Sequence, residues 1–423
     1  MMSYSEKITK YMQKRESYAI KLLQKLVQEK SISEHERQAQ AIVIETCREI
    51  GMEIDIWEPD MKELSTHPNF VSSRKDFHDS PNVVAKWSGA GGGKSIILNG
   101  HIDVVPEGDM KQWRNDPYDG KVEDGKVYGR GSTDMKGGNV ALLMAISAIK
   151  DLGIKLKGDI IFQSVIEEES GGAGTLAAIV RGYKADAVII PEPTNMKIFP
   201  KQQGSMWFRI NIKGKAAHGG TRYEGVSALE KATLVIKKIH ELEQKRNSEV
   251  SDPLFKSISI PLPINIGKIE GGNWPSSVPD LVLMEGRIGV GPHETLEDVR
   301  KELSEALVSL EEIDPWLKEN PVQLEWFGAQ WVPGSIKEDH TFLKLLESNF
   351  EKVTGQSPTL EASPWGTDGG LFTALLNTPT IVFGPGTTEV AHYPNEYIKI
   401  DQMMKAAEII ASLLIDWCEI AEK

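Results

Sequence analysis

The chain is poor in cysteine, with only Cys47 and Cys418 among 423 residues, and neither lies in a CxxC or Cys/His cluster. A disulfide framework is therefore not expected. The longest apolar run, Val140 to Ile149, is too short to cross a bilayer. The first residues are charged throughout and lack the apolar core of a secretory signal. These absences predict a cytoplasmic protein with no membrane partner.

A basic excess and a nucleotide-binding loop are also missing. The formal net charge is -13, which repels phosphate backbones, so we expect no nucleic-acid partner and a small-molecule substrate instead. The run GAGGGKS resembles a phosphate loop, but the first glycine that it requires would fall at Ser88. The run GGAGT is not GxGxxG. A dinucleotide-binding fold therefore lacks its fingerprint.

The length favours two or three domains, and the first 200 residues alternate apolar strands with helices. Such alternation predicts an α/β fold, in which a mostly parallel sheet is covered by helices on both faces. The segments 82–87 and 95–105 are expected to be neighbouring strands. The other expected strands are 52–59, 159–166 and 185–193, and the expected helices are two within 5–50, 138–153 and 174–183.

The pattern changes near Gly204, where two helices alternate with several strands in the manner of a compact α+β domain. Periodicity of the first kind resumes at 340–353 and 401–420. The first domain is therefore predicted to be interrupted. We expect it to comprise residues 1–202 and 337–423, with 203–336 as the inserted domain.

Imidazole and carboxylate side chains follow several of the expected strands. In α/β sheets, ligands collect at the carboxyl ends of the strands. Nitrogen and oxygen ligands around one pocket are what a pair of divalent cations such as zinc needs. The sequence therefore predicts a two-metal hydrolase whose ligands are His101, Asp134, Glu169, Glu192 and His392.

Each of these ligands has a structural alternative. His101 and Asp103 are two apart on a strand, so Asp103 can orient the metal-binding ring, but His101 could also be a hydrogen-bonded loop histidine. Asp134 could bridge two cations or cap the following helix. Glu192 lies between two prolines and His392 follows a turn, so either could be structural. Only the combination favours a metal centre.

Three consecutive carboxylates, Glu167, Glu168 and Glu169, follow an apolar strand. If buried, they would repel one another strongly without a neighbouring cation. The alternative is a solvated acidic turn. In the metal interpretation, one glutamate binds metal and its neighbour takes a proton from the attacking water. Lys136 is either a substrate contact or a solvated turn charge.

The motifs GHIDVVP, GRGSTDMKGG, EEESGGAGT, EPT and AHYPNEYI follow one another across essentially the whole chain. Together they resemble the acetylornithine deacetylase and succinyl-diaminopimelate desuccinylase family of dimetal amidohydrolases, which includes aminoacylases and bacterial glutamate carboxypeptidases. The resemblance implies a zinc-peptidase-like catalytic domain with an inserted lid and dimerisation domain. It also implies a homodimer and two zinc ions, with cobalt or manganese as alternatives.

The resemblance further assigns roles. It places His101 and either Glu192 or Glu169 on separate zinc ions, with Asp134 bridging and His392 completing the second site. It makes Glu168 the general base and Glu169 a ligand, and it implies a cis peptide between Asp134 and Met135.

In the lid, His218 resembles the histidine that reaches across a dimer to stabilise the oxyanion, and Arg287 resembles the arginine that pairs with a substrate carboxylate. Gly366, Thr367 and Asp368 resemble the loop that lines the substrate pocket. Ser276 departs from the family pattern, because many desuccinylases have an asparagine there. The substrate is therefore left open.

The predicted reaction is hydrolysis of the amide in a small N-acyl amino acid or related N-acyl amine, nominally like acetylornithine deacetylase. A formylaminopyrimidine deformylase, an aminoacylase and a dipeptidase are chemically equivalent alternatives at the metal. A catalytically inert binding module would be expected to lack the base or a ligand, and this sequence lacks neither.

Overall fold

A computed structural model gives the structure of this protein and describes residues 2–421. The chain divides into two compact units. The first comprises residues 1–201, 334–361 and 368–423, and the second comprises 202–333 and 362–367. Among the described residues, no helix has both the length and the apolarity that a membrane span requires.

The first unit is built on a sheet with the strand order β1-β2-β6-β3-β7-β15-β8-β13, to which β14 is added beside β8. The central strands β6, β3, β7 and β15 are parallel, whereas β2 pairs antiparallel with β6 and β8 pairs antiparallel with β15. The strands are β1 Glu53–Trp57, β2 Asn82–Trp87, β3 Ile96–His101, β6 Ile160–Val165, β7 Val188–Ile190, β8 Ile198–Gln202, β13 Gly334–Ser335, β14 Leu360–Ser363 and β15 Thr380–Val382.

The centre of this sheet is apolar on both faces. Every residue of β3, β6 and β7 is buried, as expected for parallel strands that are covered by helices on both sides. The α/β fold predicted from the sequence is confirmed. The expectation that 82–87 and 95–105 are neighbouring strands is wrong, because β6 lies between β2 and β3. Parallel pairing with β6 and β7 on its two sides occupies both edges of β3.

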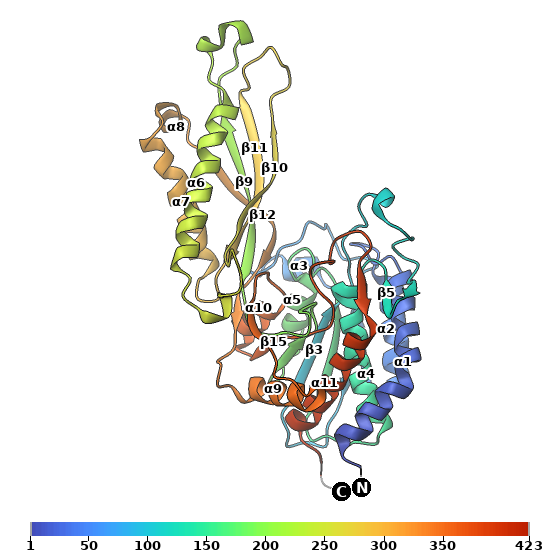
Figure 1. The fold of residues 1–423 in the computed structure, drawn as a ribbon. Coiled ribbons are helices and arrows are strands. Elements are labelled where there is room, and N and C mark those ends of the chain that lie inside the picture. The colour runs from blue at the N-terminus through green and yellow to red at the C-terminus, as the bar shows by residue number, and fades with distance from the viewer. Residues whose placement is uncertain (1, 422–423) are drawn as a thin grey trace. The chain divides into compact units, whose positions relative to one another are not determined.

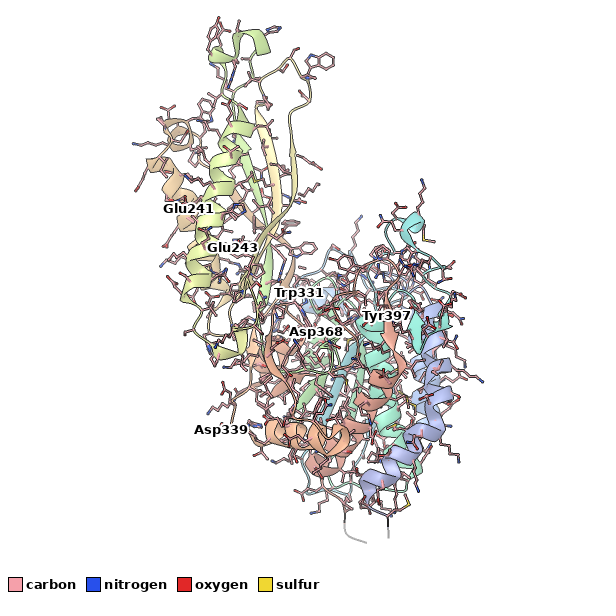
Figure 2. All side chains as sticks on the ribbon, in the orientation of Figure 1. Glu241, Glu243, Trp331, Asp339, Asp368 and Tyr397 are labelled. Carbon is pink, nitrogen blue, oxygen red and sulfur yellow. The ribbon has the colours of Figure 1, made fainter. Side chains whose placement is uncertain are left out.

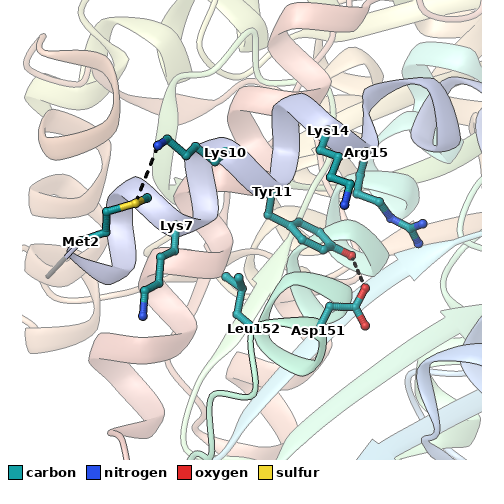
Figure 3. Close-up of a pocket in the computed structure, with 8 residues that line it drawn as sticks. All are labelled: Met2, Lys7, Lys10, Tyr11, Lys14, Arg15, Asp151 and Leu152. Carbon is teal, nitrogen blue, oxygen red and sulfur yellow. Dashed lines mark hydrogen bonds between the residues drawn. The ribbon is translucent and has the colours of Figure 1, made fainter.

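Helices cover both faces of the sheet (Figure 1): α1, α4 and α11 pack together on one face, and α5 and α10 pack on the other. Helix α1 begins with a capping box formed by Ser3 and Glu6, and its Tyr11 hydroxyl donates to Asp151 of α4 at 2.8 Å (Figure 3). The helices are α1 Tyr4–Gln28, α2 Arg37–Ile50, α3 Met61–Leu64, α4 Gly137–Asp151, α5 Ala173–Val180, α9 Thr341–Thr354, α10 Gly369–Leu376 and α11 Ile400–Cys418.

A small sheet in the first unit joins two segments that are distant in the sequence. Its strand order is β16-β5-β4, with β4 Val122–Glu123, β5 Lys126–Tyr128 and β16 Tyr397–Lys399. Tyr397, which begins β16 (Figure 2), pairs with Tyr128, and their ring centroids are 5.5 Å apart. This pairing brings the segment that contains His392 beside the segment that leads to Asp134.

The second unit is an antiparallel sheet with the order β10-β11-β9-β12, and α6 and α7 lie on one of its faces (Figure 1). Alternating residues of β9 are buried against these helices, as in a sheet with one covered face. Its elements are β9 Gly204–Lys213, β10 Ile264–Gly271, β11 Leu281–Val290, β12 Gln323–Trp331, α6 Ala228–Glu249, α7 Leu296–Val308 and α8 Pro315–Glu319.

The second unit begins one residue earlier than the sequence expectation of 203–336, and its boundaries differ from that expectation in two further ways. The chain returns to the first unit at Gly334, and the segment 362–367 clusters with the second unit. Within this unit, Gln203 donates from its main chain to the Ser363 carbonyl at 3.2 Å, and its side chain contacts the Pro364 carbonyl. These hydrogen bonds explain why a segment so distant in sequence packs there.

Candidate metal centre

The predicted ligands converge at the carboxyl ends of the parallel strands of the first unit. His101 is the last residue of β3, Glu169 follows β6, and Glu192 follows β7. Asp134 lies in the turn that precedes α4, and His392 lies in the segment before β16. Five side chains from five different segments are therefore brought to one edge of the sheet, as expected for a parallel α/β arrangement.

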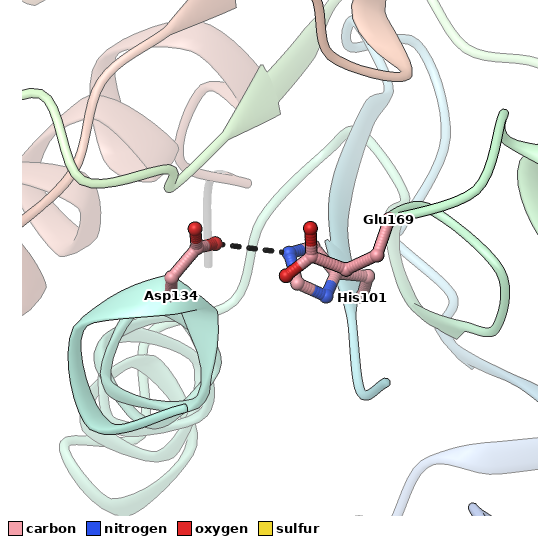
Figure 4. A group of neighbouring side chains, drawn as sticks. All are labelled: His101, Asp134 and Glu169. Carbon is pink, nitrogen blue, oxygen red and sulfur yellow. Dashed lines mark hydrogen bonds and ion pairs between the residues drawn. The ribbon is translucent and has the colours of Figure 1, made fainter. Parts of the chain in front are cut away.

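Asp134 lies between the two imidazoles. Its Oδ1 atom is 3.2 Å from Nε2 of His101, and its Oδ2 atom is 3.2 Å from Nε2 of His392. Nε2 of His392 is also 3.1 Å from Oε2 of Glu169. Figure 4 shows His101, Asp134 and Glu169 pointing toward one another. Each oxygen of Asp134 therefore faces a different imidazole.

Glu192 and Glu168 complete the cluster on the His101 side. Nε2 of His101 is 3.7 Å from Oε1 of Glu192 and 3.9 Å from Oε2 of Glu168. Two sets of donor atoms are close enough to share a cation, because the atoms of each lie within 4.8 Å of one another. They are the sets His101, Asp134, Glu169 and His101, Glu168, Glu192.

His101 is oriented by main-chain groups. Its Nδ1 atom is 2.8 Å from the carbonyl oxygen of Asp103, whereas the Asp103 carboxylate is 3.7 Å away. That carboxylate instead accepts the main-chain N–H groups of Glu168 and Glu169 at 3.3 and 3.2 Å. Asp103 therefore orients the ring with its main-chain carbonyl and the glutamate segment with its carboxylate, whereas the HxD spacing had predicted only that Asp103 orients the ring.

The three consecutive glutamates point to three different partners. Glu167, with a φ of 62°, forms a buried ion pair with Arg74, whose Nε is 2.6 Å from Oε1. Arg74 also pairs with the buried Glu36. Glu168 and Glu169 face the two imidazoles. The alternative of a solvated acidic turn is therefore wrong for Glu167, which lies in the interior with its own cation.

Burial, neighbouring charges and hydrogen bonds shift the pKa values of the cluster. Burial, reinforced by the Glu192 carboxylate, raises the pKa of Glu168 well above its usual range. Burial raises the pKa of Asp103 to about 8. Burial also disfavours the charged form of Asp134, but hydrogen bonds with His101 and His392 outweigh it and lower the pKa of Asp134. For His392, burial is outweighed by the Glu169 carboxylate, and the pKa rises to about 11.

The donor set fits divalent metal ions. Two imidazoles are surrounded by four carboxylates, those of Asp134, Glu168, Glu169 and Glu192. Within the described residues, these carboxylates form ion pairs with the two imidazoles. Two charged imidazoles would leave two negative charges unbalanced. Two divalent cations with neutral imidazoles would balance all four, and nitrogen and oxygen donors suit borderline metals.

Asp368 lies buried beside this cluster. It precedes α10 (Figure 2), and its Oδ2 atom accepts a hydrogen bond from the hydroxyl of Thr175 at 2.6 Å. Burial raises the pKa of Asp368 to about 6.

Thr367 and Gly366 belong to the second unit, where the Thr367 hydroxyl donates to Gln202 at 2.6 Å. Thr367 and Asp368 are both almost fully buried.

His218 and Arg287 belong to the second unit. His218 is exposed, and its Nδ1 atom accepts the main-chain N–H of Gly220 at 3.1 Å. Arg287 lies on β11 opposite Asn265 of β10, and burial lowers the pKa of its guanidinium. Neither residue is a member of the cluster in the first unit.

Several groups beside the cluster of imidazoles and carboxylates were not identified from the sequence. Arg130 and Glu396 form a buried ion pair next to Asp134, and Asn139 donates to the main-chain carbonyl of His101 at 2.6 Å. All three lie within or beside the motifs that contain the predicted ligands, which was the only sequence signal for them.

Both interpretations of Lys136 are wrong. Its buried ammonium donates to the carbonyls of Leu26 and Glu29 at 2.8 and 2.9 Å.

The peptide bond between Asp134 and Met135 is cis, as the family resemblance implied. Residues 97–416 match the model of peptidase family M20/M25/M40. This span contains every residue of the cluster.

Curated relatives align over most of the chain. An N-formyl-4-amino-5-aminomethyl-2-methylpyrimidine deformylase from Halalkalibacterium halodurans is 31% identical and covers 99% of both chains. The deformylase of the same name from Bacillus subtilis is 32% identical over 88% of this chain and 87% of its own. An acetylornithine deacetylase from Edwardsiella ictaluri is 27% identical over 80% of this chain and 84% of its own.

Solved structures share the fold. A tripeptidase from Staphylococcus aureus has a TM-score of 0.74 at 22% identity, covering 95% of this chain and 98% of its own. A dinuclear metal-binding peptidase from Bacillus subtilis has a TM-score of 0.66 at 18% identity, covering 97% of this chain and 100% of its own. The family match, the deformylase relatives and the cluster of carboxylates and imidazoles lead to one conclusion. The chain belongs to peptidase family M20/M25/M40 and is a metal-dependent amidohydrolase.

Proposed function

We propose that this enzyme removes the formyl group from an N-formylated aminomethylpyrimidine by hydrolysing its amide. The buried cluster of four carboxylates and two imidazoles supports the reaction class, because it supplies donors for two cations and one further carboxylate that can move a proton. The two deformylases support the substrate, since both exceed the deacetylase in identity and in coverage of the chain. Deacetylation of acetylornithine is the second candidate.

Two divalent cations, which we propose to be zinc, would polarise the amide carbonyl and lower the pKa of a nearby water molecule when bound. His101 and Glu192 would hold one ion, and His392 and Glu169 the other. This division follows from the carboxylate that, apart from the shared Asp134, lies nearest to each imidazole. Asp134 would bridge the ions, because its two oxygens face different imidazoles.

Glu168 is the proposed general base. It accepts a proton from the attacking water while the water oxygen bonds to the amide carbon. It then delivers that proton to the amine nitrogen as the carbon–nitrogen bond breaks, so the products are formate and the free amine. Glu168 suits this role because its Oε2 atom lies 3.9 Å from Nε2 of His101, beside the proposed ions, while Glu192 and Asp134 remain free to hold them.

We propose that the second unit supplies substrate contacts and the dimer. Arg287, half-buried on β11, would pair with a polar group of the substrate, and Gly366 and Thr367 would line its pocket. His218 of one chain would stabilise the oxyanion at the site of a second copy. Exposed apolar side chains of the second unit, Tyr223 at 81% and Trp274 at 69%, suit a protein contact.

The absence of a disulfide between the two cysteines is typical of proteins in a reducing compartment. Cys47 and Cys418 are buried free thiols, and we propose a cytoplasmic location. Fractionation of cells that express the tagged chain would test this, and recovery outside the cytoplasm would contradict it.

The first prediction concerns the metals. The purified chain should bind two divalent ions, a strong chelator should abolish hydrolysis, and zinc, cobalt or manganese should restore it. His392→Ala should lose one ion, because it removes one of the imidazoles beside Asp134. Elemental analysis measures the stoichiometry. A surface histidine variant, His78→Ala, is the control and should keep both ions. A chain that takes up no metal and hydrolyses normally in chelator would refute the proposed centre.

The second prediction concerns the base. Glu168→Ala should lower kcat by about 10²–10⁴-fold, the usual contribution of general acid–base catalysis. Metal content should be unchanged, because Glu192 and Asp134 remain as ligands. Steady-state kinetics with elemental analysis of the same sample measures both. Activity that is retained in Glu168→Ala would remove this residue from the mechanism.

The third prediction concerns the substrate. Metal-loaded enzyme should show its highest kcat/KM with N-formyl-4-amino-5-aminomethyl-2-methylpyrimidine. Acetylornithine, other N-acyl amino acids and dipeptides should be poorer substrates. Release of free amine measures all of them in one assay, and the Glu168→Ala variant corrects for contaminating activity. A higher kcat/KM for acetylornithine would reverse the order of the two candidate functions.

The fourth prediction concerns the dimer. Sedimentation should give the mass of two chains, and His218→Ala should lower kcat by about 10²–10³-fold, as expected for loss of an oxyanion donor. Mixing His218→Ala with Glu168→Ala and allowing the chains to exchange should restore partial activity. Each mixed dimer would have one complete site. Normal sedimentation without any recovery of activity would show that His218 does not act on the site of a second chain.

A further inference from the structure

A buried ion pair links two segments of the first unit that carry metal ligands. Nη1 of Arg130 is 2.5 Å from Oε2 of Glu396, although the residues are 266 positions apart. The side chain of Arg130 is 2% exposed and that of Glu396 is fully buried. Neither residue is in the cluster of imidazoles and carboxylates, and nothing in the proposed reaction uses them.

The carboxylate oxygen of Glu396 that does not pair with Arg130 binds the main chain at Asp134. Its Oε1 atom accepts the N–H of Thr133 at 2.9 Å and the N–H of Asp134 at 3.2 Å. Hydrogen bonds from main-chain N–H groups to a carboxylate are charge-assisted and stronger than neutral ones. Glu396 therefore fixes the position of the main chain from which the Asp134 side chain extends into the cluster.

Arg130 holds the main chain that carries His392. Its Nη2 atom donates to the carbonyl of His392 and to the carbonyl of Pro106, both at 3.3 Å. The guanidinium lies 5.3 Å from the ring centroid of Trp113. The His392 residue itself has a φ of 65°, a conformation that non-glycine residues rarely adopt. The hydrogen bond to its carbonyl helps to hold the main chain in that conformation.

We propose that Arg130 and Glu396 are positioning residues of the metal centre, one for His392 and the other for Asp134. Because the two residues are bonded to each other, they set the separation of two ligands that come from different segments. Groups that hydrogen-bond to metal ligands without contacting the metal affect metal affinity by about 10–100-fold. The inference rests on the proposed metal centre, since it assigns the pair a function only if His392 and Asp134 bind metal.

A purely structural role is the alternative, because a buried ion pair can simply satisfy two buried charges. The second unit offers a matched comparison. Arg246 is also buried, and it pairs with Glu294 at 2.6 Å and donates to the carbonyl of Gly289 at 2.8 Å. All of these partners lie in the second unit, whereas the proposed metal ligands lie in the first.

The test measures metal binding directly. Glu396→Gln and Arg130→Lys would be compared with the unaltered enzyme and with Arg246→Lys, using full-length protein. Competition with a chromophoric chelator gives the zinc affinities, and visible absorption of the cobalt-loaded protein reports ligand geometry. Because an unpaired buried charge destabilises the folded chain, the double variant Arg130→Met/Glu396→Gln, which removes both charges, is included.

A positioning role predicts zinc affinity about 10–100-fold weaker in Glu396→Gln, Arg130→Lys and the double variant, with an altered cobalt spectrum. Arg246→Lys should leave both readouts unchanged, even if its thermal stability falls. Unchanged zinc affinities and cobalt spectra in the folded Arg130 and Glu396 variants would overturn the inference while leaving the metal centre intact. Failure of the unaltered enzyme to bind zinc or cobalt would instead overturn the proposed function itself.

Discussion

The burial of several like charges at one edge of a sheet is the constraint on which this structure depends. Asp134, Glu168, Glu169 and Glu192 surround two imidazoles at the carboxyl ends of parallel strands. Carboxylates at such distances in a poorly solvated site are unfavourable unless cations neutralise them or their pKa values rise. The fold creates this condition, because a parallel sheet presents successive strand ends at a single edge. A metal-dependent hydrolase uses the same condition to hold divalent cations.

Hydrogen bonds to main-chain groups position the predicted ligands. The carbonyl of Asp103 orients the His101 ring, while its carboxylate accepts two main-chain N–H groups of the glutamate segment. Asn139 holds the carbonyl of His101. Glu396 holds the main chain at Asp134 in the same way. Buried polar main-chain groups must be satisfied, so the partners that satisfy them also fix where each ligand points.

Much of the fold followed from the sequence because its signals are local. Continuous apolar segments identified the buried parallel strands, and the change of pattern near Gly204 identified the second unit. Strand order depends on pairing between distant segments, and the sequence did not show that β6 separates β2 from β3. Nor did it show that the segment 362–367 packs with the second unit, since that placement depends on hydrogen bonds to Gln203.

By itself, the sequence determined which side chains could form a metal centre, because ligand chemistry depends on residue type and the motifs preserve it. Only the tertiary structure decided which partner each side chain meets. Three adjacent glutamates look equivalent in the sequence, yet Glu167 is bound by Arg74 while its two neighbours face imidazoles. Lys136 looks like a solvated charge, yet its ammonium is buried against main-chain carbonyls. The physical reason is that burial and pairing are set by segments far away in the chain, which no local pattern records.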